Sequence, residues 1–198
     1  MSGIIAQNTL DSSGLIKAPT GGGAWTFISK QTASSSSDIS FTSGLDSTYK
    51  VYLFTFTNAH PATDGANLQV NFTDGSSDLS KQSTCLRLYH TEAGSSPLFD
   101  YLDGLDLNNS TSEQTLVENN GNGNDESISG FLYLYSPSDT TFVKNYMGNA
   151  MGYQKNNAVN SQITGGYVNS TSAVTVARFQ MNTGNVDAGD FCLYGLST

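Results

Sequence analysis

The chain has 198 residues, of which 37% are hydrophobic, 11% aromatic and only 13% charged. A chain of this length can bury a core large enough to need no metal or disulfide. The 17 acidic residues outnumber the 8 basic ones and give a net charge of −9, and no stretch forms the basic stripe that a nucleic-acid backbone requires, so we expect no nucleic-acid partner.

Membrane insertion and secretion are not predicted either. No segment stays apolar over the roughly 18 residues that a membrane-spanning helix needs. The first residues, "MSGIIAQNTLDSSGLIKAP", lack the basic region and the long apolar core of a secretory signal.

Residues 1–23 are predicted to be an N-terminal arm, separate from a domain formed by residues 24–198. The arm ends in "APTGGG", a composition typical of a flexible joint. It is too apolar for a solvated tail, so we expect it to lie along a partner's surface or along its own domain. Its candidate partner-binding residues are Ile4, Ile5, Leu10, Leu15 and Ile16.

From residue 24 onward, short strands alternate with turns. The segment "STYKVYLFTFTN" is nearly continuously apolar and predicts a central strand. In "ANLQVNFTDG", Leu68, Val70 and Phe72 fall on one face. The last strand, "GDFCLYGL", is apolar on both faces and is predicted inside a sheet. We expect "AVTVARFQM" and "GDFCLYGL" to be neighbours in one sheet.

The region from residue 93 to 125 is rich in Gly, Asn and Ser. A structureless loop of this length is unusual, so we expect a short helical turn or an extra strand pair, followed by an exposed turn at "ENNGNGND". No amphipathic helix is predicted elsewhere. About ten short strands separated by turns indicate an all-β fold, an antiparallel β-sandwich of the jelly-roll type.

The sequence contains none of the common catalytic, phosphate-binding or metal-binding motifs. His60 and His90 are expected to be surface or hydrogen-bonding residues. Cys85 and Cys192 lie in apolar strand-like runs and are expected to be buried free thiols. A disulfide between two strands remains the alternative.

Two further features could carry a function. Asp100, Asp103 and Asp106 recur every three residues, which does not match a calcium loop. We therefore expect an ordinary acidic loop, with calcium binding as the alternative. Tyr133 and Tyr135 alternate with leucines, so either the tyrosines or the leucines are expected to point away from the core. Tyrosines on such a face can serve intrachain packing, subunit contacts or sugar stacking. No catalytic, cofactor or metal site is predicted.

Several phrases resemble one protein family. These are "AWTFISKQTASSSSDISFTSGLDSTYKVYLFTFTNAHPATDG", "SISGFLYLYSPSDTTFVK" and "GGYVNSTSAVTVARFQMNTGNVDAGDFCLYGL". They are similar to small jelly-roll-like virion structural proteins of tailed bacteriophages, especially those of marine phages and cyanophages. The resemblance implies a homotrimer on the outer surface of the virion, made in the host cytoplasm. It brings no catalytic residues and no cofactor.

The resemblance leads to a capsid decoration (cement) protein as the first functional expectation. Such a protein would bind the major capsid protein or another virion protein through its arm, and brace neighbouring capsomers. The alternative is a tail-fibre or receptor-binding module whose 93–125 region recognises a host glycan. An enzyme such as a glycan depolymerase ranks last, because no paired carboxylates can be identified.

Overall fold

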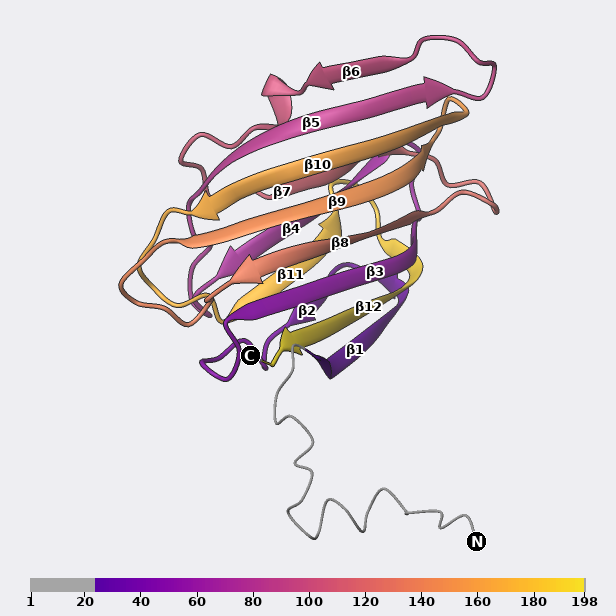
Figure 1. Cartoon of the computed structure of the whole chain (residues 1–198). Helices are drawn as coiled ribbons and strands as arrows, with labels where there is room; N and C mark the ends of the chain where they lie inside the picture. Colours follow the sequence, from indigo (N-terminus) through magenta and orange to yellow (C-terminus); the bar gives the residue numbers. More distant parts are fainter. Residues whose placement is uncertain (1–23, 198) are drawn as a thin grey trace, which may run out of the picture.

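The structure is a computed structural model that describes residues 24–197 (Figure 1). Within this range the chain forms twelve β-strands and one short 3-10 helix, η1. The elements in chain order are β1 (Trp25–Ser36), β2 (Ile39–Phe41), β3 (Val51–Pro61), β4 (Ala66–Thr73), β5 (Lys81–Thr91), β6 (Leu98–Tyr101), η1 (Asp103–Leu105), β7 (Gln114–Asn120), β8 (Ile128–Tyr135), β9 (Lys144–Gln154), β10 (Ala158–Val168), β11 (Val176–Met181) and β12 (Val186–Leu196).

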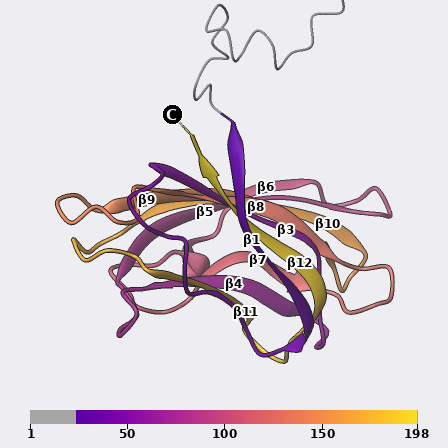
Figure 2. The same cartoon turned by 90° about the horizontal axis from the view of Figure 1, so that it is seen from below.

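Eight of the strands form a jelly roll. Its two four-stranded halves have the orders β1-β12-β3-β8 and β2-β11-β4-β7. Strands far apart in the chain pair antiparallel, β1 with β12, β2 with β11, β3 with β8 and β4 with β7. The two halves lie as layers one above the other (Figure 2). This arrangement confirms the predicted antiparallel sandwich and its jelly-roll character.

The other four strands widen one layer. Strands β9, β10, β5 and β6 continue from β8 and produce a large sheet with the order β1-β12-β3-β8-β9-β10-β5-β6. The small sheet is β7-β4-β11-β2. The ten strands expected from sequence become twelve because the 93–125 region supplies β6 and β7, together with the expected helical turn, η1. The two strands do not pair with each other, since β6 pairs with β5 and β7 pairs with β4.

The core lies between the layers and contains a cluster of phenylalanines. Phe179 of the small sheet faces Phe54 and Phe191 of the large sheet, with ring centroids 5.4 and 5.6 Å apart. Phe41 and Phe56 complete the cluster at 6.3 and 6.2 Å from the Phe179 ring. These rings join the two layers. The predicted inward face of β4 is also confirmed, because Leu68, Val70 and Phe72 are all buried.

The C-terminal strand β12 lies between β1 and β3, as its apolar sequence predicted. The expected pairing of "AVTVARFQM" with "GDFCLYGL" is wrong. Strand β11 pairs with β4 and β2 in the small sheet, whereas β12 belongs to the large sheet. The turn between them therefore crosses from one layer to the other, and Phe179 and Phe191 meet across the core instead of lying side by side.

Candidate interaction surface

The outer face of the large sheet, the side turned away from the small sheet, carries many exposed apolar side chains. Side chains alternate between the two faces of a strand, so the neighbours of buried residues point outward. The exposed fractions of these residues range from 36% to 69%. They are Leu88, Phe99, Tyr101, Phe131, Met147, Met151, Val159, Ile163 and Tyr167.

Strand register places these side chains in continuous rows, because residues directly opposite on neighbouring strands stand next to each other. One row crosses β8, β9, β10, β5 and β6 through Phe131, Asn149, Ile163, Leu86 and Tyr101. The next row along the strands passes through Ser129, Met151, Ser161, Leu88 and Phe99. The rows therefore combine apolar side chains with uncharged polar ones on β8, β9 and β10, and are apolar throughout on β5 and β6.

The outer face carries no lysine, arginine, aspartate or glutamate on five of its strands. Strands β3, β8 and β10 contain none of these residues at all, while β5 and β9 contain only Lys81, Arg87 and Lys144. Lys81 and Lys144 are completely buried. Arg87 points inward, where its guanidinium binds Glu118 of β7 at 2.7 Å and Asp100 at 2.8 Å. The charge of this acidic protein lies elsewhere on its surface.

The inner side of β10 is mostly polar instead. On β10, Asn160, Gln162 and Thr164 are buried, while the intervening Ile163 is 38% exposed. These buried side chains bind the backbone of β7 in the other layer. The Gln162 carbonyl accepts the Glu118 N–H at 2.7 Å, and Thr164 donates to the Thr115 carbonyl at 3.4 Å. Polarity is therefore inverted on β10, with polar residues inside and apolar residues outside.

The outer face of the small sheet has the usual polar character. Gln69, Arg178 and Gln180 point outward between buried core residues. The Arg178 guanidinium lies 3.5 Å from the Asp78 carboxylate and 3.3 Å from that of Glu113. The two faces of the sandwich thus differ sharply, and only the large-sheet face is apolar.

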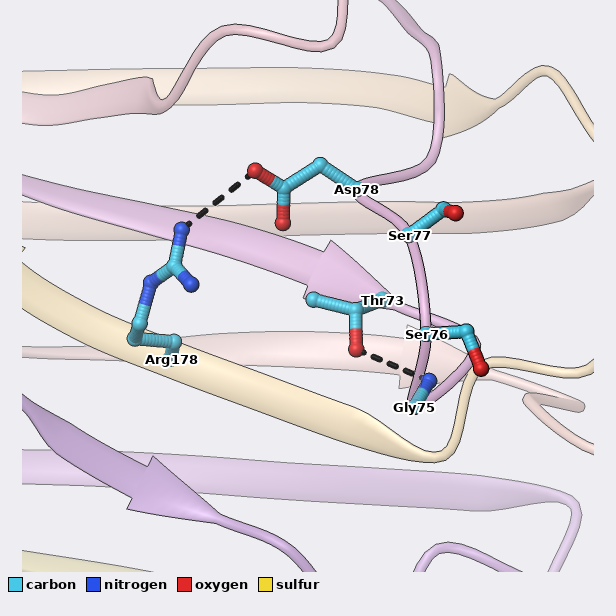
Figure 3. Close-up of a pocket in the computed structure, with 6 residues that line it drawn as sticks. All are labelled: Thr73, Gly75, Ser76, Ser77, Asp78 and Arg178. Atoms are coloured by element: carbon cyan, nitrogen blue, oxygen red, sulfur yellow. Dashed lines mark hydrogen bonds and ion pairs between the residues drawn. The ribbon is translucent and has the colours of Figure 1, made fainter.

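A pocket of about 290 Å³ opens beside Arg178, at the end of β4 (Figure 3). The Asp74 carboxylate at its turn accepts the N–H groups of Ser76 and Ser77 at 2.9 and 2.8 Å, which lowers the pKa of Asp74. The Thr73 hydroxyl accepts the Gly75 N–H at 3.0 Å. These contacts stabilise the turn, and the lining residues include no nucleophile paired with a base.

The histidines and aspartates singled out in the sequence lie apart. The ring of His60 is hydrogen-bonded to the Gly123 carbonyl at 3.0 Å, and His90 is exposed on β5. Asp100 binds Arg87, and Asp106 contacts the Tyr101 hydroxyl. Within residues 24–197, no group of three or more His, Cys, Asp or Glu side chains could hold a metal ion.

Both cysteines are free. Cys85 is buried as expected, and burial raises the pKa of its thiol. Cys192 is only partly buried, contrary to expectation, because its side of β12 faces outward. The expected exit of Tyr133 and Tyr135 from the core is confirmed, since the leucines between them are buried. The arm candidates Ile4, Ile5, Leu10, Leu15 and Ile16 lie outside the described residues.

Sequence reasoning missed most of the outer face. In β9 the exposed Met147 and Met151 alternate with the buried Tyr146 and Ala150, so both faces are apolar and the pattern does not distinguish the outer one. Comparison with protein-family models, with curated proteins and with solved structures gives no match to this chain. No helix in the described part of the chain is long and apolar enough to cross a membrane.

Proposed function

We propose that the protein is a non-catalytic structural protein that assembles by packing the outer face of its large sheet against further copies of the same chain. The observation that carries this proposal is the apolar, charge-free character of that face over β3, β8, β9, β10 and β5. Its exposed ion pair, Lys30–Asp190, lies on β1 and β12 at the other edge of the sheet. With strands about 4.8 Å apart and a rise of about 3.3 Å per residue, the six strands from β3 to β6 present roughly 800 Å². A stable interface buries about 800 Å² on each partner, so the face is large enough.

Electrostatics favour a second copy as the occupant. Copies with a net charge of −9 repel one another, but the charge-free face lets them meet with no ion to desolvate. Asn149 and Ser161, which lie between the apolar residues, already bond to each other at 3.2 Å, so they can be buried at low cost. Closed symmetric oligomers are the common outcome of such self-association. From the family resemblance we expect a trimer.

The same family resemblance supports a proposal for where this assembly is located. We propose a capsid decoration protein on the outer surface of a tailed bacteriophage, which binds the major capsid protein and braces neighbouring capsomers. Its anchor would be the arm, residues 1–23, which lies outside the described residues. Many copies on a symmetric shell would reinforce weak individual contacts by avidity.

The self-association proposal can be tested with two variants, each of which adds one charge to the outer face of one of the two sheets. A Cβ added at Gly165, in the middle of the outer face on β10, meets no atom within 4 Å. Gly165→Glu therefore adds a charge there without disturbing the fold. Gln180→Glu adds the same charge to the outer face of the small sheet and is the matched control.

Sedimentation velocity on the full chain should show an oligomer for the wild type and for Gln180→Glu. Gly165→Glu should dissociate to a folded monomer, with the far-UV circular dichroism of the wild type. A wild type that stays monomeric at 100 µM contradicts the proposal, and so does a Gly165→Glu variant with unchanged mass.

The virion assignment needs its own test, which is the copy number per particle. Hundreds of copies on the shell, seen by quantitative mass spectrometry and by labelling, support a decoration protein. A dozen copies confined to the tail would overturn it. Deletion of residues 1–20 should abolish capsid binding and leave the domain folded, whereas unchanged binding would remove the arm as the anchor.

A specific observation also favours the tail-fibre alternative. Aromatic rings form a ladder on the outer face, where Tyr133 lies 6.0 Å from Trp25, 5.3 Å from Phe131 and 6.3 Å from Tyr135. Exposed rings on a β-sheet can stack on sugars. Binding to a host glycan in an array, lost in Tyr133→Ala, would support this function over the decoration of capsids.

A further inference from the structure

Lys81 and Asn71 form a buried pair where the chain crosses from the small sheet to the large one. Asn71 lies near the end of β4, Lys81 is the first residue of β5, and both are completely buried. The Lys81 ammonium donates a hydrogen bond to the Asn71 side-chain carbonyl. An amine that contacts this oxygen lies within about 3.5 Å of the carboxamide carbon, which is the separation from which attack can occur.

Neighbouring groups hold both side chains in this arrangement. The Lys81 amine also contacts the backbone carbonyl of Leu79 at 2.9 Å, and the Asn71 amide nitrogen donates to the Thr111 carbonyl at 3.2 Å. The Phe72 N–H donates to the same Asn71 oxygen at 2.9 Å. A fixed backbone donor at this oxygen would stabilise the negative charge that develops there during an attack.

The surroundings also supply a neutral amine and two carboxylates whose charge acts on it. Burial lowers the pKa of Lys81 to about 8, so roughly a tenth of the amine is neutral at pH 7. Asp78 and Glu113, both bound to Arg178, are the nearby carboxylates that act on the Lys81 charge. Arg178 lies directly opposite Asn71 in the pairing of β11 with β4.

We propose that Lys81 and Asn71 join in an intramolecular isopeptide bond. The neutral Lys81 nitrogen attacks the Asn71 Cγ and forms a new C–N bond. The bond from Cγ to Nδ2 breaks, and Nδ2 leaves as ammonia with the proton that the attacking nitrogen gives up through a neighbouring carboxylate. The chain loses one ammonia, about 17 Da, and the reaction needs no oxidant or cofactor.

The bond would connect the two layers covalently. Strand β4 belongs to the small sheet and β5 to the large sheet, and residues 74–80 form the crossing between them. A link from residue 71 to residue 81 closes this crossing into a ring. This inference does not depend on the proposed function, because it concerns a bond inside one chain.

Mass spectrometry of the full chain tests the proposal. We expect an intact mass about 17 Da below that of the sequence. Trypsin should fail to cleave after Lys81 and should release residues 51–87 as one peptide with the mass deficit, without fragment ions between Asn71 and Lys81. Lys81→Met should restore the full mass. Lys144→Met removes the other lysine that is buried within residues 24–197. Its amine donates to the Ser170 carbonyl at 2.9 Å, and the variant should keep the deficit.

Two results would overturn the proposal. One is a full intact mass in the wild type after prolonged incubation at pH 8. The other is a deficit that maps to Asn120–Gly121 or Asn122–Gly123, where succinimide formation has the same mass and hydroxylamine cleaves the chain. The wild-type peptide map decides between these results even where Lys81→Met does not fold.

Discussion

Replacement of Phe179 by alanine tests how the two layers are held together. The ring is fully buried in the small sheet and packs on Phe54, Phe56 and Phe191 of the large sheet. A buried Phe→Ala change costs about 3–5 kcal/mol through lost burial and the cavity that remains. Strands on both sides limit collapse of the cavity, so we expect the free energy of unfolding to fall by about 4 kcal/mol. This is a large part of the roughly 5–15 kcal/mol that unfolding of a typical domain requires.

Urea denaturation followed by circular dichroism measures this loss. The midpoint should fall while the slope m stays unchanged, because the surface exposed on unfolding is nearly the same. Phe142, which is 70% exposed, supplies the control. Phe142→Ala should change stability by less than about 0.5 kcal/mol. A loss below about 1 kcal/mol for Phe179→Ala would refute the idea that these rings join the layers.

Three further predictions concern the polar interior and the strands. Arg87→Gln leaves the two carboxylates it binds without their partner, and should cost about 1–3 kcal/mol in urea denaturation. Asn71→Ala cannot form the isopeptide bond and so keeps a free Lys81 amine. Burial lowers the pKa of Lys81 from 10.5 to about 8 in the folded chain. Between pH 8 and 10.5 the unfolded chain therefore binds more protons at Lys81 than the folded chain does. Stability should then rise with pH in that window, by at most about 1.4 kcal/mol per pH unit, and Lys81→Met on the same background should remove the rise. A Cβ at Gly130 would lie 2.3 Å from a backbone oxygen of β9, so Gly130→Ala should cost about 1–3 kcal/mol in thermal unfolding, whereas Gly165→Ala should stay within about 0.5 kcal/mol.

Local patterns predicted the strands well, and pairing between distant strands is where sequence reasoning failed. The alternation in β4 and the apolar β12 needed only neighbouring residues to be interpreted. The relation of β11 to β12 could not be predicted in this way, because a short turn can close a hairpin or cross between layers. Both strands have an apolar face in either case. The choice depends on β4 and β3, which lie far away in the sequence.

The candidate surface and the burial of Lys81 beside Asn71 could not be predicted from the sequence, for related reasons. In β9, one face has Tyr146 and Ala150 and the other has Met147 and Met151. Both faces are apolar, so the sequence does not tell which one a second layer covers. From the sequence alone, Lys81 is expected to be a solvent-exposed residue at the start of a strand. It is buried among segments that are distant in the sequence, which include Ser110, whose backbone bonds to that of Lys81 at 2.8 and 3.0 Å, and Val168 of β10.

The inverted polarity of β10 bears most directly on function. The jelly roll is complete without β9, β10, β5 and β6, and β7 of the small sheet covers the inner side of β10 through polar contacts. If these strands served only the stability of a single chain, their apolar residues would face inward and their polar residues outward. On β10 the opposite holds, since Gln162 is fully buried while Val159 is 54% exposed. The added strands supply Tyr146, Ala150 and Val168 to the core, and they also widen the apolar outer face, which is the pattern expected where a second chain completes the burial.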